Sequence, residues 1–359
     1  NVLSWYRPYV YEIKEVKYFI DGISPDRTEA LIEVDENIQN EEMREDFRTM
    51  NRLIEYKSIK LESDYSMQHF YNLSDTSIVS SNKWTIWDLK FYAQGDGHYV
   101  KLNDAANMKA FRTNTSEFED VLSFDDTWIS IVDDPKGDIN ELALNITFEE
   151  NSTTDTLFTN KNVYVLMLGT NALSIDLGYK KIVVDYFYNN HYHIRFANLD
   201  GTEEHQSIIP KDETLNFVYF SFNNAGEVVS VEPDKNTWDL LFTRSTDIAI
   251  YFTDTILDYS ITGVILNPYT NKAYRVQDEN YETTTSENIN ETNLSNQLNV
   301  IGYDWKFYDL ETSRYEPREN NYYVIKDGNS IFYKMEFKSF IDEVTGERGT
   351  ISFEYNAIQ

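Results

Sequence analysis

Short apolar runs that alternate with polar residues dominate the chain, and they predict strands rather than long helices. One pattern occurs twice, as Trp87-Asp88-Leu89-Lys90-Phe91 and, 238 − 87 = 151 residues later, as Trp238-Asp239-Leu240-Leu241-Phe242. In each copy Trp, Leu and Phe occupy alternate positions, the period of a strand with one face in a core. Each copy also follows two short apolar runs, Phe70–Leu73 with Ile78–Val79 and Phe220–Asn223 with Val228–Val229. The repeat predicts a duplicated β unit in which Trp87 and Trp238 have equivalent surroundings.

The ends of the two copies correspond as well. Tyr164-Val165-Leu166, Gly169 and Tyr179-Lys180 match Tyr323-Val324-Ile325, Gly328 and Tyr333-Lys334 in the same order. The predicted fold is therefore mostly β, with two tandem antiparallel β-sheet domains of sandwich or barrel type. The boundaries we expect are residues 63–212 for the first domain and 213–359 for the second.

Residues 1–62 match neither copy and form an N-terminal extension. Between Asn37 and Ile54, apolar residues recur at helical spacing among many charges, which predicts one amphipathic helix. Asn37 is a suitable N-cap, because its side-chain oxygen can accept from the first free N–H groups of a helix.

Composition strengthens the β prediction and narrows the function. Aromatic residues make up 15% of the chain, with 27 Tyr and 21 Phe, and such side chains favour pleated, half-buried surfaces. The charge is strongly acidic, 61 Asp and Glu against 31 Lys and Arg. Nucleic acid is excluded as an expected partner, since phosphate binding depends on clusters of Lys and Arg.

The chain contains no cysteine, which rules out disulfides, thiolate nucleophiles and Cys-ligated metal centres. No apolar run is long enough to predict a transmembrane segment. The sequence starts at Asn1 rather than Met, so we expect a mature or trimmed product. Motifs of the common hydrolases, nucleotide-binding enzymes and zinc proteases are missing from the sequence, and we predict that the protein is not an enzyme.

Several segments resemble one known family. Asn236 to Arg244 is similar to the W-D-x-x-x-x-R segment of the HmuY-type haem-binding lipoproteins of Bacteroidota, and Tyr322 to Tyr355 resembles their closing strands. Residues 213–359 are the closer match, and residues 63–212 a looser one. The resemblance implies an all-β exported protein at the outer membrane, at the cell surface or on the periplasmic face. Membrane contact would come through a lipid anchor outside this sequence, and haem would be captured for a TonB-dependent transporter.

The family holds haem iron with His or Met side chains, and the second copy has neither between Thr243 and Asn321. In the first copy the same interval offers His98 and Met108, a pair that can ligate haem iron. We take this pair as the candidate haem site. The alternative is that His98 is a turn residue and that Met108 packs in the core.

Two weaker metal hypotheses follow from spacing. His191 and His193 stand two apart in a predicted strand, so they share a face and could bind a metal ion. The alternative is that both simply face water, together with Arg195. The acidic turns 133–138 and 200–204 could hold Ca²⁺, although neither follows the EF-hand pattern, and plain solvated turns are the alternative.

Three functions therefore remain open. The first is haem capture, and the second is an accessory or structural lipoprotein subunit of an outer-membrane protein complex, with no haem site. The third is a Ca²⁺-stabilised adhesion or glycan-binding module. In every case we expect the repeated motif to form a structural core, made by Trp87, Asp88, Phe91, Trp238, Asp239 and Phe242.

Overall fold

The computed structural model describes residues 55–151, 154–250, 256–277, 281, 284–342 and 344–358. The expected helix at residues 37–54 lies outside these ranges. The described residues form antiparallel strands and short 3₁₀ helices, so the prediction of a mostly β fold is confirmed. Among them, no helix is long and apolar enough to cross a bilayer.

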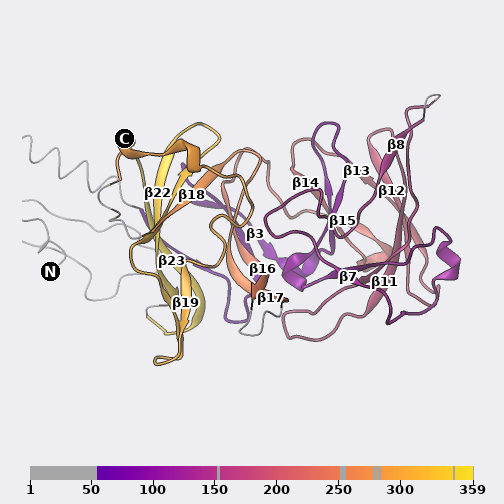
Figure 1. The fold of residues 1–359 in the computed structure, drawn as a ribbon, viewed down its shortest axis with the longest axis horizontal. Helices are drawn as coiled ribbons and strands as arrows, with labels where there is room; N and C mark the ends of the chain where they lie inside the picture. The colour runs from indigo at the N-terminus through magenta and orange to yellow at the C-terminus, as the bar shows by residue number, and fades with distance from the viewer. Residues whose placement is uncertain are drawn as a thin grey trace, which may run out of the picture.

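Four sheets lie in sequence along the long axis of the molecule (Figure 1). Outer sheet 1 has the order β13 (His205–Pro210), β12 (His191–Ala197), β11 (Tyr179–Tyr188), β10 (Tyr164–Met167), β6 (Lys109–Arg112) and β7 (Ser130–Ile131), with β9 (Leu157–Thr159) pairing β11 and β8 (Phe148–Glu150). Inner sheet 1 has the order β15 (Glu227–Val229), β14 (Phe217–Ser221), β4 (Leu89–Tyr92) and β5 (Val100–Leu102).

The other two sheets follow the same plan. Inner sheet 2 has the order β17 (Ile256–Leu266), β16 (Leu240–Ile250), β2 (Met67–Asn72) and β3 (Ser77–Lys83). Outer sheet 2 has the order β1 (Glu55–Lys60), β23 (Arg348–Ala357), β22 (Phe332–Ile341), β21 (Asn321–Lys326) and β18 (Lys272–Gln277). A small hairpin, β19 (Lys306–Asp309) with β20 (Arg314–Pro317), completes the described strands.

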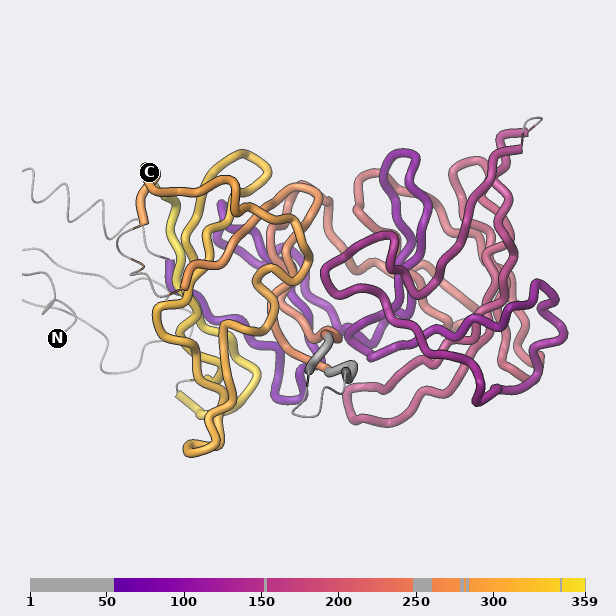
Figure 2. Tube along the Cα trace, in the orientation of Figure 1, coloured from indigo at the N-terminus to yellow at the C-terminus, as the bar shows by residue number. Residues whose placement is uncertain are grey.

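The two copies exchange their first hairpins. The β2–β3 hairpin precedes the first Trp-Asp motif in the chain, yet β2 pairs with β16, which follows the second motif. In return, β14 pairs with β4, which follows the first motif. The first half of the molecule is thus continuous, residues 84–231, whereas the second half joins 55–83 to 232–358. The tube in Figure 2 shows the indigo N-terminal strands lying within the orange and yellow half.

This pairing crosses the expected boundary between residues 212 and 213, and the pairing of β1 with β23 crosses the one between residues 62 and 63. The limits 63–212 and 213–359 were drawn where the sequence repeat begins again, and they remain a prediction about folding units. A repeat identifies equivalent strands, but it does not determine which of two equivalent motif strands a given hairpin will pair with.

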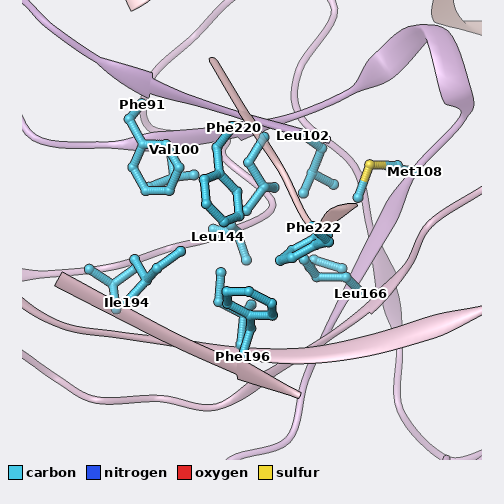
Figure 3. Close-up of a cluster of buried hydrophobic side chains, with 14 of the residues drawn as sticks. Phe91, Val100, Leu102, Met108, Leu144, Leu166, Ile194, Phe196, Phe220 and Phe222 are labelled. Carbon is cyan, nitrogen blue, oxygen red and sulfur yellow. The ribbon is translucent and has the colours of Figure 1, made fainter. Parts of the chain in front are cut away.

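Each half has its own apolar core between its inner and outer sheets. In the first half Phe220 of β14 lies between Phe91 of β4 and Phe196 of β12 (Figure 3), with ring centroids 6.2 and 5.7 Å away. In the second half Phe242 stacks on Phe353 of β23, with centroids 5.2 Å apart. All five rings are almost completely inaccessible to solvent.

A third apolar cluster joins the halves. Trp87 makes an edge contact with Tyr219, at 4.8 Å and 86°, and Trp238 makes the same kind of contact with Phe70, at 4.9 Å and 84°. Trp87 and Trp238 therefore have equivalent ring partners. Their position differs from the predicted one, since both precede their strands and pack between the inner sheets, away from Phe91 and Phe242.

The aspartates of the motif attach the exchanged hairpins. Asp88 accepts hydrogen bonds from Ser221 Oγ at 3.0 Å and from the N–H of Phe222 at 2.7 Å. Asp239 accepts from the N–H of Leu73 at 2.7 Å. Asp88 thus binds the end of β14, and Asp239 binds the end of β2. In each case the bound strand comes from the other copy, so the contact joins distant parts of the sequence.

A buried lysine also fastens a loop in each half. Lys181 of β11 donates to the carbonyl oxygens of Phe118 and Val121, at 3.0 and 2.8 Å. Lys334 of β22 donates to the carbonyls of Tyr281 and Thr284, at 2.9 and 3.4 Å. Both lysines lie opposite a valine of the neighbouring strand. The equivalent of Lys334 is therefore Lys181, one position beyond the Lys180 that the sequence comparison had paired with it.

Candidate functional site

A cavity of about 1130 Å³ lies where the halves meet. Its wall combines the β4–β5 region and the loop at 132–146 from the first half with β16, β17 and the segment 296–302 from the second. Aromatic side chains from both halves line it, among them Trp87, Tyr92, Tyr99, Trp238 and Tyr269. A space of this size exceeds what a drug-sized ligand needs and could admit a flat macrocycle.

His98 lines this cavity from the loop between β4 and β5. Its ring packs against Phe187, with centroids 4.2 Å apart, and more loosely against Phe148 at 5.4 Å and Tyr192 at 6.0 Å. His98 Nε2 is buried and has no hydrogen-bond partner among the described residues.

Burial lowers the pKa of His98 to about 4, and the nearby Lys211 ammonium acts in the same direction. Lys211 is held there by hydrogen bonds to the carbonyls of Gly95 and Gly97. At neutral pH the imidazole is therefore uncharged and keeps a lone pair, the form in which histidine ligates a metal.

Met108 lines the same cavity, and its side chain is 2% exposed. Figure 3 shows it beside Leu102, at the edge of the core that contains Leu166 and Phe222. The structure thus places both members of the predicted haem pair at one cavity, while Met108 also fills core space. Its role as a ligand stays a prediction.

Charged groups also reach the cavity. Lys90 and Lys101 are opposite partners on β4 and β5, so their side chains point to the same face. Lys90 Nζ lies 5.2 Å from the ring centroid of Phe217 and 5.6 Å from that of Trp87. Lys101 is buried, and burial lowers the pKa of its amine while the nearby Asp133 carboxylate opposes that shift.

Glu232 stands at the boundary between the halves. Its carboxylate accepts from Asn216 Nδ2 at 2.8 Å, the N–H of Phe217 at 3.0 Å and Trp238 Nε1 at 3.1 Å. Burial raises the pKa of Glu232 to about 7 in spite of these donors. Trp87 is placed differently: its Nε1 is buried and has no partner among the described residues.

The His191 and His193 hypothesis concerns the other face of outer sheet 1. Tyr192, Ile194 and Phe196 are buried, while both histidines are on the opposite, partly exposed side of β12. His193 stacks on Tyr186, with centroids 4.2 Å apart. In the part of the chain that the structure describes, no group of three or more His, Asp or Glu side chains could hold a metal ion.

The acidic turns proposed for Ca²⁺ use their carboxylates locally. Asp133 accepts from the N–H groups of Leu102 and Ala143, at 2.8 and 2.9 Å. Asp200 accepts from the N–H and hydroxyl of Thr202, at 2.9 and 2.6 Å. These contacts engage two of the carboxylates, and a Ca²⁺ site at these turns stays a prediction.

Lys90, Lys101 and Glu232 were not identified as site residues from the sequence. Lys101 reads as the polar position of an alternating strand, Val100-Lys101-Leu102, and Glu232 as one of many surface acids. Only the packing of the two halves against each other encloses these groups. The one available signal was the position of Lys101 immediately after the turn that carries His98.

Comparison with known proteins finds a family model that matches part of the chain. Residues 212–355 match the model of the HmuY protein family. Among solved structures, apo PinO from Porphyromonas gingivitis is similar, with 8% identity over 85% of this chain and 98% of the other, and a TM-score of 0.32. A putative HmuY-like heme-binding protein from Bacteroides vulgatus (9% identity, 84% and 91% coverage, TM-score 0.22) and a putative lipoprotein from Bacteroides fragilis (10%, 84% and 90%, 0.21) are also similar. No curated protein matches.

Proposed function

Because residues 212–355 carry the HmuY family sequence, we propose that this chain is an exported, non-enzymatic binding protein that captures haem or a related planar ligand. The site is the cavity between the halves, and His98 is the residue that binds the iron. Met108 is the second candidate ligand from the same wall.

One observation carries this proposal: His98 has a buried, unpaired Nε2 at an aromatic-lined cavity. A buried polar atom without a partner destabilises the protein, and a bound metal would supply the missing partner. The low pKa of His98 keeps the ring neutral, so that no proton competes with iron at neutral pH.

The proposal extends to a place in the cell. A protein that captures such a ligand outside the cell has to pass it on, and we propose a TonB-dependent outer-membrane transporter as the recipient. The protein itself would be held at the outer membrane by a lipid anchor. The formal charge of −30 favours a partner whose docking surface is basic.

Titration with haemin tests the ligand. We expect a sharp Soret band that saturates at one haemin per chain, and we expect His98→Ala to abolish it. Met108→Leu conserves volume, so a changed spectrum with unchanged folding would identify Met108 as the second ligand.

His191→Ala is the matched control, since His191 is on the face of β12 that points away from the core. It should bind haemin as the wild type does. A wild-type spectrum that cannot be distinguished from that of free haemin would overturn the proposal, as would a Soret band that His98→Ala leaves intact.

A second candidate function rests on a different surface. The loop between β10 and β11 exposes Leu173, Ile175 and Leu177, with Leu173 75% accessible. Exposed apolar side chains at alternate positions favour a contact with another protein, as expected for an accessory subunit of an outer-membrane complex. Co-purification from native membranes would support it, and an isolated monomer would count against it.

A further inference from the structure

The equivalent tryptophans of the two motifs differ in one respect. Trp238 Nε1 donates to the Glu232 carboxylate at 3.1 Å, whereas Trp87 Nε1 has no acceptor within the described part of the chain. Both indoles are buried, at 6% and 4% exposure, and both line the cavity. A buried indole N–H normally has a partner. At Trp87 the chain therefore lacks an acceptor that it supplies at Trp238.

Register explains the difference. In the β2–β3 hairpin Phe70 pairs with Ser80, and in the equivalent β14–β15 hairpin Tyr219 pairs with Val229. Lys83 is the third residue after Ser80, and Glu232 is the third residue after Val229. Lys83 therefore occupies the position that corresponds to Glu232. Lys83 cannot accept a hydrogen bond as Glu232 does, so Trp87 Nε1 lacks this acceptor, while the Trp87 side chain lines the cavity.

Two cations lie beside this indole. Lys90 Nζ is 5.6 Å from the Trp87 ring centroid, and Lys101 is its opposite partner on β5. Lys101 is 6% exposed, and no carboxylate of the described residues lies within 4.0 Å of its Nζ. A lysine that is enclosed without a direct counterion favours a negatively charged group next to it.

Three of the acidic side chains that line the cavity are already engaged by donors, and Asp104 and Asp134 join Asp133 in attracting Lys101. Asp133 accepts from two backbone N–H groups, Asp134 accepts from the N–H of Asp138, and Glu232 is surrounded by donors. Asp133 attracts Lys101 at longer range and offsets part of its charge. Lys90 Nζ lies over the rings of Phe217 and Trp87, so the Trp87 side of the cavity is the place for an added anion.

We propose that Trp87 Nε1, Lys90 and Lys101 form a subsite for an anionic oxygen group, such as a carboxylate, on a planar aromatic ligand. The ligand's anionic oxygen would accept a hydrogen bond from Trp87 Nε1, just as the Glu232 carboxylate accepts one from Trp238 Nε1. This inference deepens the proposed function and rests on it for the identity of the cavity as the binding site. It assigns the acid group of the ligand to side chains other than His98.

A pair of fluorescent probes tests the subsite without haem. Anilinonaphthalene sulfonate carries an anionic group, and its parent phenylnaphthylamine has the same rings without it. We expect the full chain to bind the sulfonate about tenfold more tightly, a difference of the size that one charge-assisted contact provides. Trp87→Phe and Lys101→Met should each reduce this preference to about threefold or less.

Trp128→Phe and Lys161→Met are the controls, because these residues do not line the cavity. They should keep the wild-type preference. Equal binding of the two probes to the wild type would overturn the subsite, and so would a preference that survives both cavity substitutions or a failure of the sulfonate to bind.

Haemin and its dimethyl ester separate the two proposals. A Soret band that depends on His98, but forms equally with acid and ester and ignores Lys101→Met, would leave haem capture standing and sink the subsite. A sulfonate preference that depends on Trp87 and Lys101, in a protein that gives no Soret band, would support the subsite and overturn haem capture. When both hold, the ester should bind more weakly than haemin, and Lys101→Met should remove that difference.

Discussion

At the scale of single residues, two side chains of the cavity wall carry a buried polar atom without a partner. His98 Nε2 and Trp87 Nε1 are both buried, and neither has a hydrogen-bond partner among the described residues. Most polar atoms of the repeated motif are satisfied, as Asp88 and Asp239 illustrate. Unsatisfied buried groups are exceptions in a folded protein, and each needs an explanation. Others, such as Trp305 Nε1, lie outside the cavity wall.

The low pKa of His98 makes the stability of the folded protein depend on pH. In the folded state burial holds the pKa near 4, against 6.5 for an unperturbed histidine. As the pH falls from 6.5 to 4 the unfolded chain takes up the proton first, so the free energy of unfolding decreases. We expect His98→Gln to lack this contribution, and urea unfolding midpoints of both proteins between pH 4 and 8 would measure it.

Above pH 6.5 the difference between the two proteins should be constant, because His98 is neutral in both the folded and the unfolded wild type. A difference that stays flat across the whole range would mean that the ring is not shielded as the structure indicates.

Residue identity alone could locate His98 and Met108 as candidates, since the sequence has only five histidines and six methionines. It could not reveal the subsite beside Trp87. The tryptophans look identical in the sequence, and they differ only because Glu232 reaches one of them and Lys83 replaces it in the other half.

At the scale of elements, alternation of apolar and polar residues located most strands. Tyr164-Val165-Leu166 and Tyr179-Lys180, which the sequence comparison aligned with the second copy, lie in the paired strands β10 and β11, and the segment expected to close the second copy ends in β23. The apolar residues of Trp128-Ile129-Ser130-Ile131-Val132 predict another strand, which in the structure comprises only Ser130–Ile131. Its side chains are exposed, so little burial supports a longer strand.

The buried lysines make a prediction about loop attachment. Lys181→Met removes the donor that satisfies the carbonyls of Phe118 and Val121, and leaves two buried acceptors without partners. We expect a loss of about 1–3 kcal/mol in the free energy of unfolding. Hydrogen exchange should also become faster in the 118–121 turn, which chemical denaturation and exchange mass spectrometry would detect.

Lys180→Met is the adjacent control. Lys180 contacts Glu203 at 3.2 Å at the surface, where an ion pair contributes about 1 kcal/mol or less. Equal losses of stability in the two variants would mean that the hydrogen bonds from Lys181 to the carbonyls of Phe118 and Val121 have no special role.

At the scale of the whole molecule, the exchanged hairpins decide which parts can fold alone. The fragment 84–231 contains every strand of inner sheet 1 and outer sheet 1. The fragment 213–359, which follows the expected boundary, lacks β1 to β3 and keeps β14 and β15 without β4. We expect the first fragment to be a cooperatively folded monomer and the second to aggregate or remain unfolded, as circular dichroism and size-exclusion chromatography would show.

Joining residues 55–83 to 232–359 in one engineered chain is the control, since it restores β1 to β3 to the second half. Independent folding of 213–359 would favour the boundaries drawn from the repeat. The repeat itself could be predicted from the sequence, because buried aromatic positions recur. The exchange could not, since the two hairpins are equally suited to either motif strand.

The exchange also sets an order of events as the protein is made. Ser58 of β1 bonds to Ser352 of β23, across 294 positions of chain. β1 thus has no strand to pair with until β23 has been made, and contacts over such separations form slowly. The second half therefore closes only after the residues of β23 have left the ribosome, whereas every strand of the first half is available earlier.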